Sequence, residues 1–256
     1  EYYLLTFVII VIVVLGCALG SFFNVLIYRI PQKQSIIFPG SHCENCKNLI
    51  PFYQNIPVIS YILLRGKCSK CGAKIHWHHI VVEIITPLLF LALFFRYGLH
   101  DFRFYKYILL FSFLIPVFFI DALHQIIPNV LSLPLLITGI IFVFIPGTDV
   151  GIINGLVTGA VVFCLLLFLA WAYQKMRGTE GLGGGDIWLL TALATYFGLT
   201  GIPYIFLLSA LMGIIYFLIF IRDKSKPFAF GTFIVLAAVL WSVIGEETIF
   251  QLLPVI

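Results

Sequence analysis

The chain has 256 residues, of which 62% are hydrophobic and only 10% are charged. Soluble domains carry about 25% charged residues, and a soluble fold of this length could not bury so much apolar surface. The composition therefore excludes an ordinary soluble domain and predicts an all-α integral membrane protein. The formal net charge is only +4, and we expect a lipid bilayer, not nucleic acid, as a partner.

Eight apolar segments follow one another along the chain, and each is a candidate transmembrane helix. A perpendicular helix needs about 20 apolar residues to cross a membrane, so the third and sixth segments should extend into their flanks or lie in a thinned or polar environment. The first segment has no basic stretch before it, which predicts a permanent transmembrane helix and not a signal peptide. The segments are residues 3–28, 80–95, 107–120, 126–145, 151–173, 187–200, 203–221 and 228–245.

Basic residues are concentrated on one side of this predicted bundle. Residues 29–79 contain seven of the fifteen Lys and Arg residues, and the positive-inside rule places such a stretch in the cytoplasm. Alternation then leaves twelve basic residues in cytoplasmic loops and three outside, namely Arg96, Arg103 and Lys106. The pattern predicts that both ends of this chain face the outside.

Residues 31–79 differ from the rest of the chain because they are polar, contain Pro and Gly, and include four cysteines. The segment is too long for a passive turn. We therefore predict a small cytoplasmic domain, inserted between a first transmembrane helix in residues 1–30 and a multi-pass membrane domain in residues 80–256.

The cysteines of this insertion form two Cys-x2-Cys pairs separated by 21 residues. Two such pairs can place four thiolates at the corners of a tetrahedron, the geometry that Zn²⁺ prefers. A cytoplasmic location keeps thiols reduced and disfavours disulfides, and four ordinary buried cysteines do not suit a loop too small to have its own core. The spacing predicts one structural zinc ion bound by Cys43, Cys46, Cys68 and Cys71.

Three acidic residues, Glu83, Asp121 and Asp186, lie at or within apolar segments. A carboxylate there costs several kcal/mol unless it is paired or hydrated, so each is a functional candidate. Asp121 ends the third segment and Asp186 begins the sixth, and the predicted topology brings both to the cytoplasmic side. Two close carboxylates share one proton, as in an aspartic peptidase. The alternative is that both aspartates only cap helix ends.

Three glycines, Gly183, Gly184 and Gly185, come directly before Asp186. Glycine lets the backbone approach a substrate closely or adopt a positive φ, which favours a catalytic loop. A glycine-rich loop before a helix can also bind phosphate. No Lys follows these glycines and no GxxxxGK[ST] motif is present, so nucleotide binding is the weaker interpretation.

Five stretches, in this order, resemble the bacterial type IV prepilin peptidases, which are bifunctional leader peptidases and N-methyltransferases of the GxGD aspartic protease class. The resemblance covers nearly the whole chain. The stretches are GSFFNVLIYRIP (20–31), the double Cys-x2-Cys loop with NIPVISYILLRGKC (55–68), Asp121 with Ile127-Pro128-Asn129, EGLGGGD (180–186) and KPFAFGTF (226–233).

The resemblance implies that Asp121 and Asp186 cut the basic leader from type IV prepilins or pseudopilins at the cytoplasmic face of the bacterial inner membrane. It also implies methylation of the new N-terminal amine with S-adenosylmethionine. Two alternatives remain, a peptidase without methylation and a transporter whose acidic residues carry protons or cations. The stretch that the resemblance associates with methyl transfer includes Gly20, Asn24, Arg29 and Glu83.

Glu83 has a specific candidate role in methyl transfer. An amine must lose its proton before it can attack a sulfonium methyl group, and an α-amine has a pKa of about 7.7–8.0. A carboxylate at the membrane edge could accept that proton. The alternative is that Glu83 only pairs with a loop cation such as Arg29.

Overall fold

A computed structural model describes residues 2–179, 183–220 and 229–244. These residues form helices joined by loops, with two isolated β-bridges in the cysteine loop, which confirms the predicted all-α class. Five of the helices are long and apolar enough to cross a membrane, and two shorter apolar helices accompany them. The predicted cytoplasmic residues Arg222, Lys224 and Lys226 lie outside the described residues.

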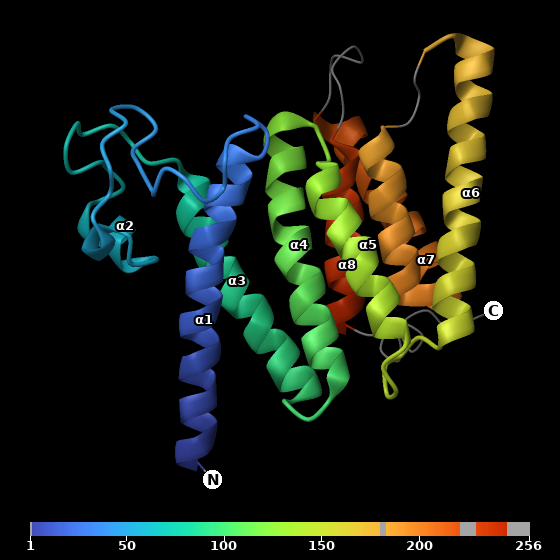
Figure 1. Cartoon of the computed structure of the whole chain (residues 1–256), viewed down its shortest axis with the longest axis horizontal. Helices are drawn as coiled ribbons and strands as arrows, with labels where there is room; N and C mark the ends of the chain where they lie inside the picture. Colours follow the sequence, from blue (N-terminus) through green and yellow to red (C-terminus); the bar gives the residue numbers. More distant parts are fainter. Residues whose placement is uncertain (1, 180–182, 221–228, 245–256) are drawn as a thin grey trace. The chain divides into compact units, whose positions relative to one another are not determined.

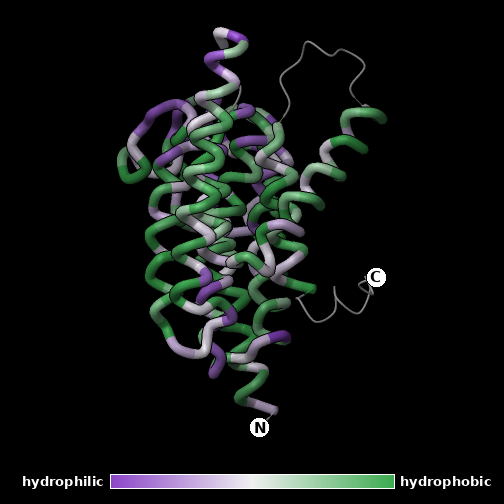
Figure 2. Tube along the Cα trace, turned by 90° about the vertical axis from the view of Figure 1, so that its right-hand side faces the viewer, coloured by the Kyte–Doolittle hydropathy of each residue, from purple (hydrophilic) through white to green (hydrophobic). Residues whose placement is uncertain are grey.

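The chain divides into two compact units, Glu1–Arg96 and Tyr97–Ile256. The first unit contains α1 (Tyr2–Arg29), the 3-10 helix η1 (Phe52–Gln54), α2 (Ile59–Leu63) and all but the last residue of α3 (Trp77–Tyr97). The second contains α4 (Phe102–His124), α5 (Asn129–Val143), α6 (Ile152–Arg177), α7 (Gly184–Phe220) and α8 (Phe230–Ile244). Hydrophobic residues dominate along the helices, and hydrophilic residues gather in the loops at their ends (Figure 2).

In the first unit, α1 and α3 pack closely because two glycines of α1 have no side chain. A Cβ atom at Gly16 would lie 2.6 Å from the Cα atom of Pro87, and one at Gly20 would lie 2.9 Å from the Cα atom of Glu83. The spacing Gly16-x3-Gly20 puts both glycines on one face of α1, the pattern that allows two membrane helices to approach. Gly20 therefore has a packing role that the sequence interpretation missed.

In the second unit, α7 reverses its direction at Gly198, whose φ of 59° and ψ of −167° are not helical. Gly185 near the start of α7 and Gly231 near the start of α8 both pack against Ile127, so the two helices begin at the same end of the unit (Figure 1). Tyr216 lies late in α7, yet its ring is 5.4 Å from that of Phe233 in the first turn of α8. The two halves of α7 thus match the two segments predicted at 187–200 and 203–221.

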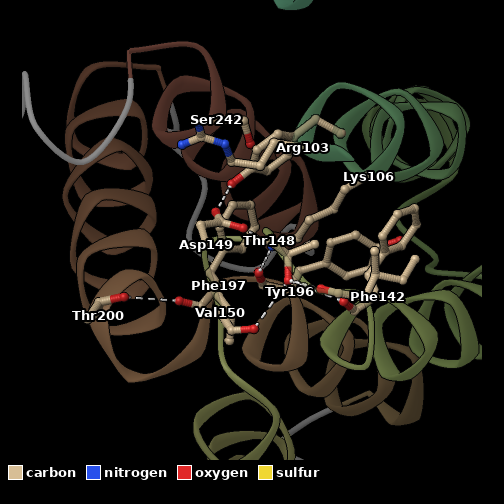
Figure 3. A network of polar contacts seen from close by, with 12 residues as sticks. Arg103, Lys106, Phe142, Thr148, Asp149, Val150, Tyr196, Phe197, Thr200 and Ser242 are labelled. Atoms are coloured by element: carbon tan, nitrogen blue, oxygen red, sulfur yellow. Dashed lines mark hydrogen bonds and ion pairs between the residues drawn. The ribbon is translucent and has the colours of Figure 1, made fainter. Parts of the chain in front are cut away.

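A buried lysine stabilises the reversal of α7 (Figure 3). The sequence interpretation placed Lys106 in an outer loop, but α4 begins earlier than predicted, and Lys106 lies within it with only 2% of its surface exposed. Its Nζ atom donates to Asp149 Oδ1 at 2.5 Å and to the Tyr196 carbonyl at 2.7 Å. The carbonyl groups before a helix break lose their regular partners, and this cation supplies one.

Candidate active site and metal centre

The structure brings Asp121 and Asp186 together around Ile127. Asp121 lies in the last turn of α4 and Asp186 in the first turn of α7. Gly185 packs directly on the Ile127 backbone, which places the start of α7 beside the loop that follows Asp121. The charge of Asp121 acts on Asp186. Two carboxylates separated by 64 residues in the sequence therefore lie in one site.

The N-terminus of α8 completes this site. The backbone N–H of Thr232 donates to Asp121 Oδ2 at 2.6 Å, and the Thr232 hydroxyl donates to the same oxygen at 3.0 Å. A Cβ atom at Gly231 would lie 3.0 Å from that oxygen and 2.5 Å from Ile127 Cδ1, so a side chain does not fit there. Sequence reasoning did not identify Thr232, although the KPFAFGTF motif contains it; residues 226–228 of that motif lie outside the described residues.

The predicted glycine loop is partly described, because residues 180–182 lie outside the described residues. Neither Gly184 nor Gly185 has a positive φ, so close approach, and not left-handed backbone, is what the structure requires at Gly185. Gly185 contacts Ile127, and a Cβ atom at Gly183 would lie 2.9 Å from Asp186 Oδ2, whereas one at Gly184 would meet nothing within 4 Å. Asp186 also lies in the first turn of a helix, where the helix dipole stabilises its charge. A position at a helix end is therefore compatible with a role in a pair of catalytic aspartates.

In the first unit, the four predicted metal ligands form one cluster. Their sulfur atoms all lie within 4.8 Å of one another, and the sulfur atoms of Cys43 and Cys71 are 3.8 Å apart. Tetrahedral zinc with Zn–S bonds of about 2.3 Å separates its sulfur ligands by ~3.8 Å. Hydrogen bonds from the backbone N–H groups of Cys71 and Lys70 lower the pKa of Cys68 to about 6, which favours the thiolate that a metal needs. The cluster fits a zinc ion.

The two Cys-x2-Cys turns share one backbone geometry. The N–H of Lys47 donates to the Cys43 carbonyl at 2.9 Å, and the N–H of Gly72 donates to the Cys68 carbonyl at 3.0 Å. Lys47 and Gly72 each follow the second cysteine of a pair, and both have a positive φ, of 58° and 71°. This repetition shows that the backbone itself holds the four thiols toward one point.

Two of the residues that the resemblance associates with methyl transfer make packing or hydrogen-bond contacts within the first unit. Gly20 packs against α3, as described above. Arg29 is only 4% exposed, and its guanidinium donates to the carbonyls of Ser35, Pro39 and Gly40 at 2.7–3.1 Å. Within the described part of the chain, Glu83 has no Lys, Arg or His nitrogen within the 4.0 Å of a salt bridge. The alternative in which Arg29 pairs with Glu83 is therefore wrong.

Asn24 and Glu83, together with Arg29, line a cavity of about 760 Å³ in the first unit, and Cys43 and Cys68 are also among its walls. Glu83 accepts a hydrogen bond from the Val58 N–H at 2.7 Å. Asn24 is 6% exposed; its Nδ2 atom donates to the His79 carbonyl at 2.9 Å. Its Oδ1 atom is the one buried side-chain N or O atom of the described residues that has no hydrogen-bond partner, and such an atom is expected to meet a partner in a ligand or water.

A bundle of apolar helices that brings two aspartates to one point has the arrangement of a membrane aspartic peptidase, here joined to a unit with a cluster of four cysteines that could bind a metal ion. Comparison with known families agrees with this class. The model of the bacterial peptidase A24 N-terminal domain matches residues 14–97, and the model of the type IV leader peptidase family matches residues 108–218.

Several curated proteins are similar to this chain over most of their length, and the three that follow carry the name prepilin leader peptidase/N-methyltransferase. The protein of Dichelobacter nodosus is 32% identical over 89% of this chain and 88% of its own. The proteins of Neisseria gonorrhoeae and Pseudomonas aeruginosa are 34% and 33% identical, covering 85% and 90% of this chain and 84% and 89% of their own. No solved structure gives a significant match. The chain therefore belongs to the type IV leader peptidase family.

Proposed function

We propose that this chain removes the basic leader from type IV prepilins or pseudopilins, with Asp121 and Asp186 as its catalytic residues. The observation that carries the proposal is the meeting of these two aspartates at Ile127, from helices far apart in the sequence. The names of the relatives support the substrate class. A transporter finds no support in those names.

The chemistry needs one ionised and one protonated carboxylate. The ionised carboxylate takes a proton from a water molecule, which attacks the carbonyl carbon of the scissile peptide bond. The protonated carboxylate donates to the carbonyl oxygen as negative charge develops there. Asp121 is 4% exposed, and this burial keeps competing water away from its carboxylate and strengthens its electrostatic interactions.

The proposed location is the inner membrane of a bacterium, with the active site on the cytoplasmic side. The support is the charge distribution, because residues 29–79 contain seven basic residues and such a loop stays in the cytoplasm. A basic leader would lie at the anionic inner surface of the membrane, and the apolar pilin helix that follows it would remain in lipid.

We further propose that the first unit methylates the new N-terminal amine. S-adenosylmethionine, when bound, supplies an electrophilic methyl group. The cavity volume is within the range of about 300–1,000 Å³ typical of small-molecule sites. Glu83 would accept the proton that the amine loses, and Asn24 Oδ1 would accept a hydrogen bond from the ligand. In this proposal the insertion, residues 31–79, has a structural role, because a zinc ion on the four cysteines would hold Cys43 and Cys68 in the cavity wall.

One experiment tests both activities. Purified protein in detergent micelles is incubated with a full-length type IV prepilin and S-adenosylmethionine, and the product is weighed by mass spectrometry. Loss of the leader together with a gain of one methyl group on the new N-terminus is the expected result. Loss of the leader alone supports a peptidase without methylation, and an unchanged prepilin contradicts the proposed function.

A further inference from the structure

The carboxylate of Asp121 is held in an unsymmetrical way. Both donors of Thr232, its backbone N–H and its hydroxyl, bind the same oxygen, Oδ2, at 2.6 Å and 3.0 Å. The N–H belongs to the first turn of α8, where backbone N–H groups have no helical partner and the helix dipole is positive. All three features stabilise a negative charge on Asp121.

Asp186 has a different environment. Among the described residues no hydroxyl group donates to its carboxylate, and the donors near it are the backbone N–H groups of Gly183 and of Asp186 itself. Neither aspartate has a Lys, Arg or His nitrogen within 4.0 Å in the part of the chain that the structure describes. The two aspartates thus act on each other, and of the two, Asp121 alone receives a hydrogen bond from a hydroxyl group of the described residues, that of Thr232.

We propose that Thr232 is a positioning residue that holds Asp121 in its ionised form, so that Asp121 is the general base of the pair and Asp186 the general acid. This inference rests on the proposed peptidase function and assigns the two roles within it. Because Thr232 occupies Oδ2, the other oxygen of Asp121 is the one that takes the proton from water. Gly231 allows this contact, since a side chain at that position would collide with the carboxylate and with Ile127.

The proton balance of the reaction follows from this assignment. In the attack, a water O–H bond breaks, its proton goes to Asp121, and its oxygen forms a bond to the carbonyl carbon while the Asp186 proton moves to the carbonyl oxygen. In the collapse, Asp121 returns its proton to the leaving nitrogen and the C–N bond breaks. One hydroxyl proton of the intermediate returns to Asp186, which restores the starting states.

The test compares Thr232→Val with Thr232→Ser in steady-state cleavage of a purified full-length prepilin over a range of pH. Valine keeps the shape and the backbone N–H but lacks the hydroxyl, whereas serine keeps both donors. Ser242→Ala is the matched control, because Ser242 is a buried hydroxyl of the same helix that donates to its own helix, at the Ala238 carbonyl. Melting temperatures of all variants are recorded, and Thr232→Ala replaces the valine variant if that protein does not accumulate.

We expect Thr232→Val to lower kcat by about 10- to 100-fold, the effect of a misplaced catalytic group, with little change in KM or melting temperature. The acidic limb of the pH profile, which reports ionisation of the base, should move to higher pH. Thr232→Ser and Ser242→Ala should behave like the wild type, a pattern that a merely structural role of Thr232 does not produce.

Any one of three results would overturn the inference and leave the proposed function intact. They are a wild-type kcat in Thr232→Val, a loss of kcat in Thr232→Ser as large as that in Thr232→Val, and a shift of the alkaline limb of the pH profile instead of the acidic limb. A wild-type protein that cuts no prepilin would overturn the proposed function, and the inference with it. The two failures are therefore distinguishable in one experiment.

Discussion

Asparagine at Asp121 or Asp186 keeps the size of the side chain but cannot exchange a proton. We therefore expect Asp121→Asn and Asp186→Asn each to lower the cleavage rate by at least about 100-fold, the lower end of what acid–base catalysis contributes. The measurement is the rate of leader loss from a prepilin, followed by mass spectrometry.

The matched control for these variants is Asp101→Asn, because Asp101 caps the start of α4 and bonds to Arg103, away from the site. It should cleave at the wild-type rate. Full cleavage by either variant of the pair would remove that aspartate from the mechanism.

Glu83 permits a second prediction for a single residue. Glu83→Gln keeps an oxygen that can accept the Val58 N–H, so the loop should keep its structure, but the negative charge is lost. We expect methylation of the cleaved product to fall by about 100-fold or more while leader removal continues.

The split between the two activities decides how the Glu83 variant is interpreted. Unchanged methylation would exclude Glu83 as the proton acceptor. Loss of both activities would show instead that Glu83 is needed for the structure of the first unit.

At the scale of elements, the reversal of α7 depends on a buried lysine, Lys106, which pairs with the partly exposed Asp149. Lys106→Met removes the cation and leaves the Asp149 carboxylate and the Tyr196 carbonyl without this donor. Leaving a buried acceptor such as this carbonyl without its donor costs about 1–3 kcal/mol, and we expect a fall in the melting temperature of the purified protein.

Lys175→Met is the control for this variant, because Lys175 is exposed on α6 beside Trp171 and should be nearly neutral. The double variant Lys106→Met/Asp149→Asn removes both charges and should recover part of the loss. Equal melting temperatures for Lys106→Met and the wild type would show that the pair does not stabilise the reversal.

At the scale of the whole molecule, the cluster of four cysteines belongs to the first unit and the aspartate pair to the second. Metal analysis should find about one zinc ion per chain. Cys46→Ser should lose the zinc and increase hydrogen exchange in residues 40–75, whereas leader removal should persist because both aspartates lie in the other unit.

Cys164→Ser is the control for the metal prediction, since Cys164 is exposed on α6 and is not part of the cluster. It should keep its zinc. A wild-type protein without metal but with a protected cysteine loop would contradict the predicted centre, and so would a Cys43–Cys46 disulfide.

Features that depend on nearby residues could be predicted from the sequence alone. Apolar segments long enough to cross a membrane predicted the helices. In lipid every backbone N–H and C=O group needs a partner within the protein, and a helix provides these partners within a single segment. The Cys-x2-Cys spacing predicted the metal cluster, since each turn is closed by backbone hydrogen bonds within five residues. Asp121 and Asp186 stood out because an acidic group is costly beside apolar segments.

Features that depend on contacts between distant segments were decided only by the tertiary structure. The bond from Thr232 to Asp121 joins residues that are 111 positions apart, and Lys106 meets the Tyr196 carbonyl across 90 positions. The sequence around Thr232 or Lys106 does not predict these partners, because a threonine or a lysine near the start of a helix is usually exposed. Helix packing decided which donors reach a buried carboxylate or carbonyl. In the interior, leaving a polar group without a partner costs more free energy than one hydrogen bond contributes, so these long-range partners matter for stability.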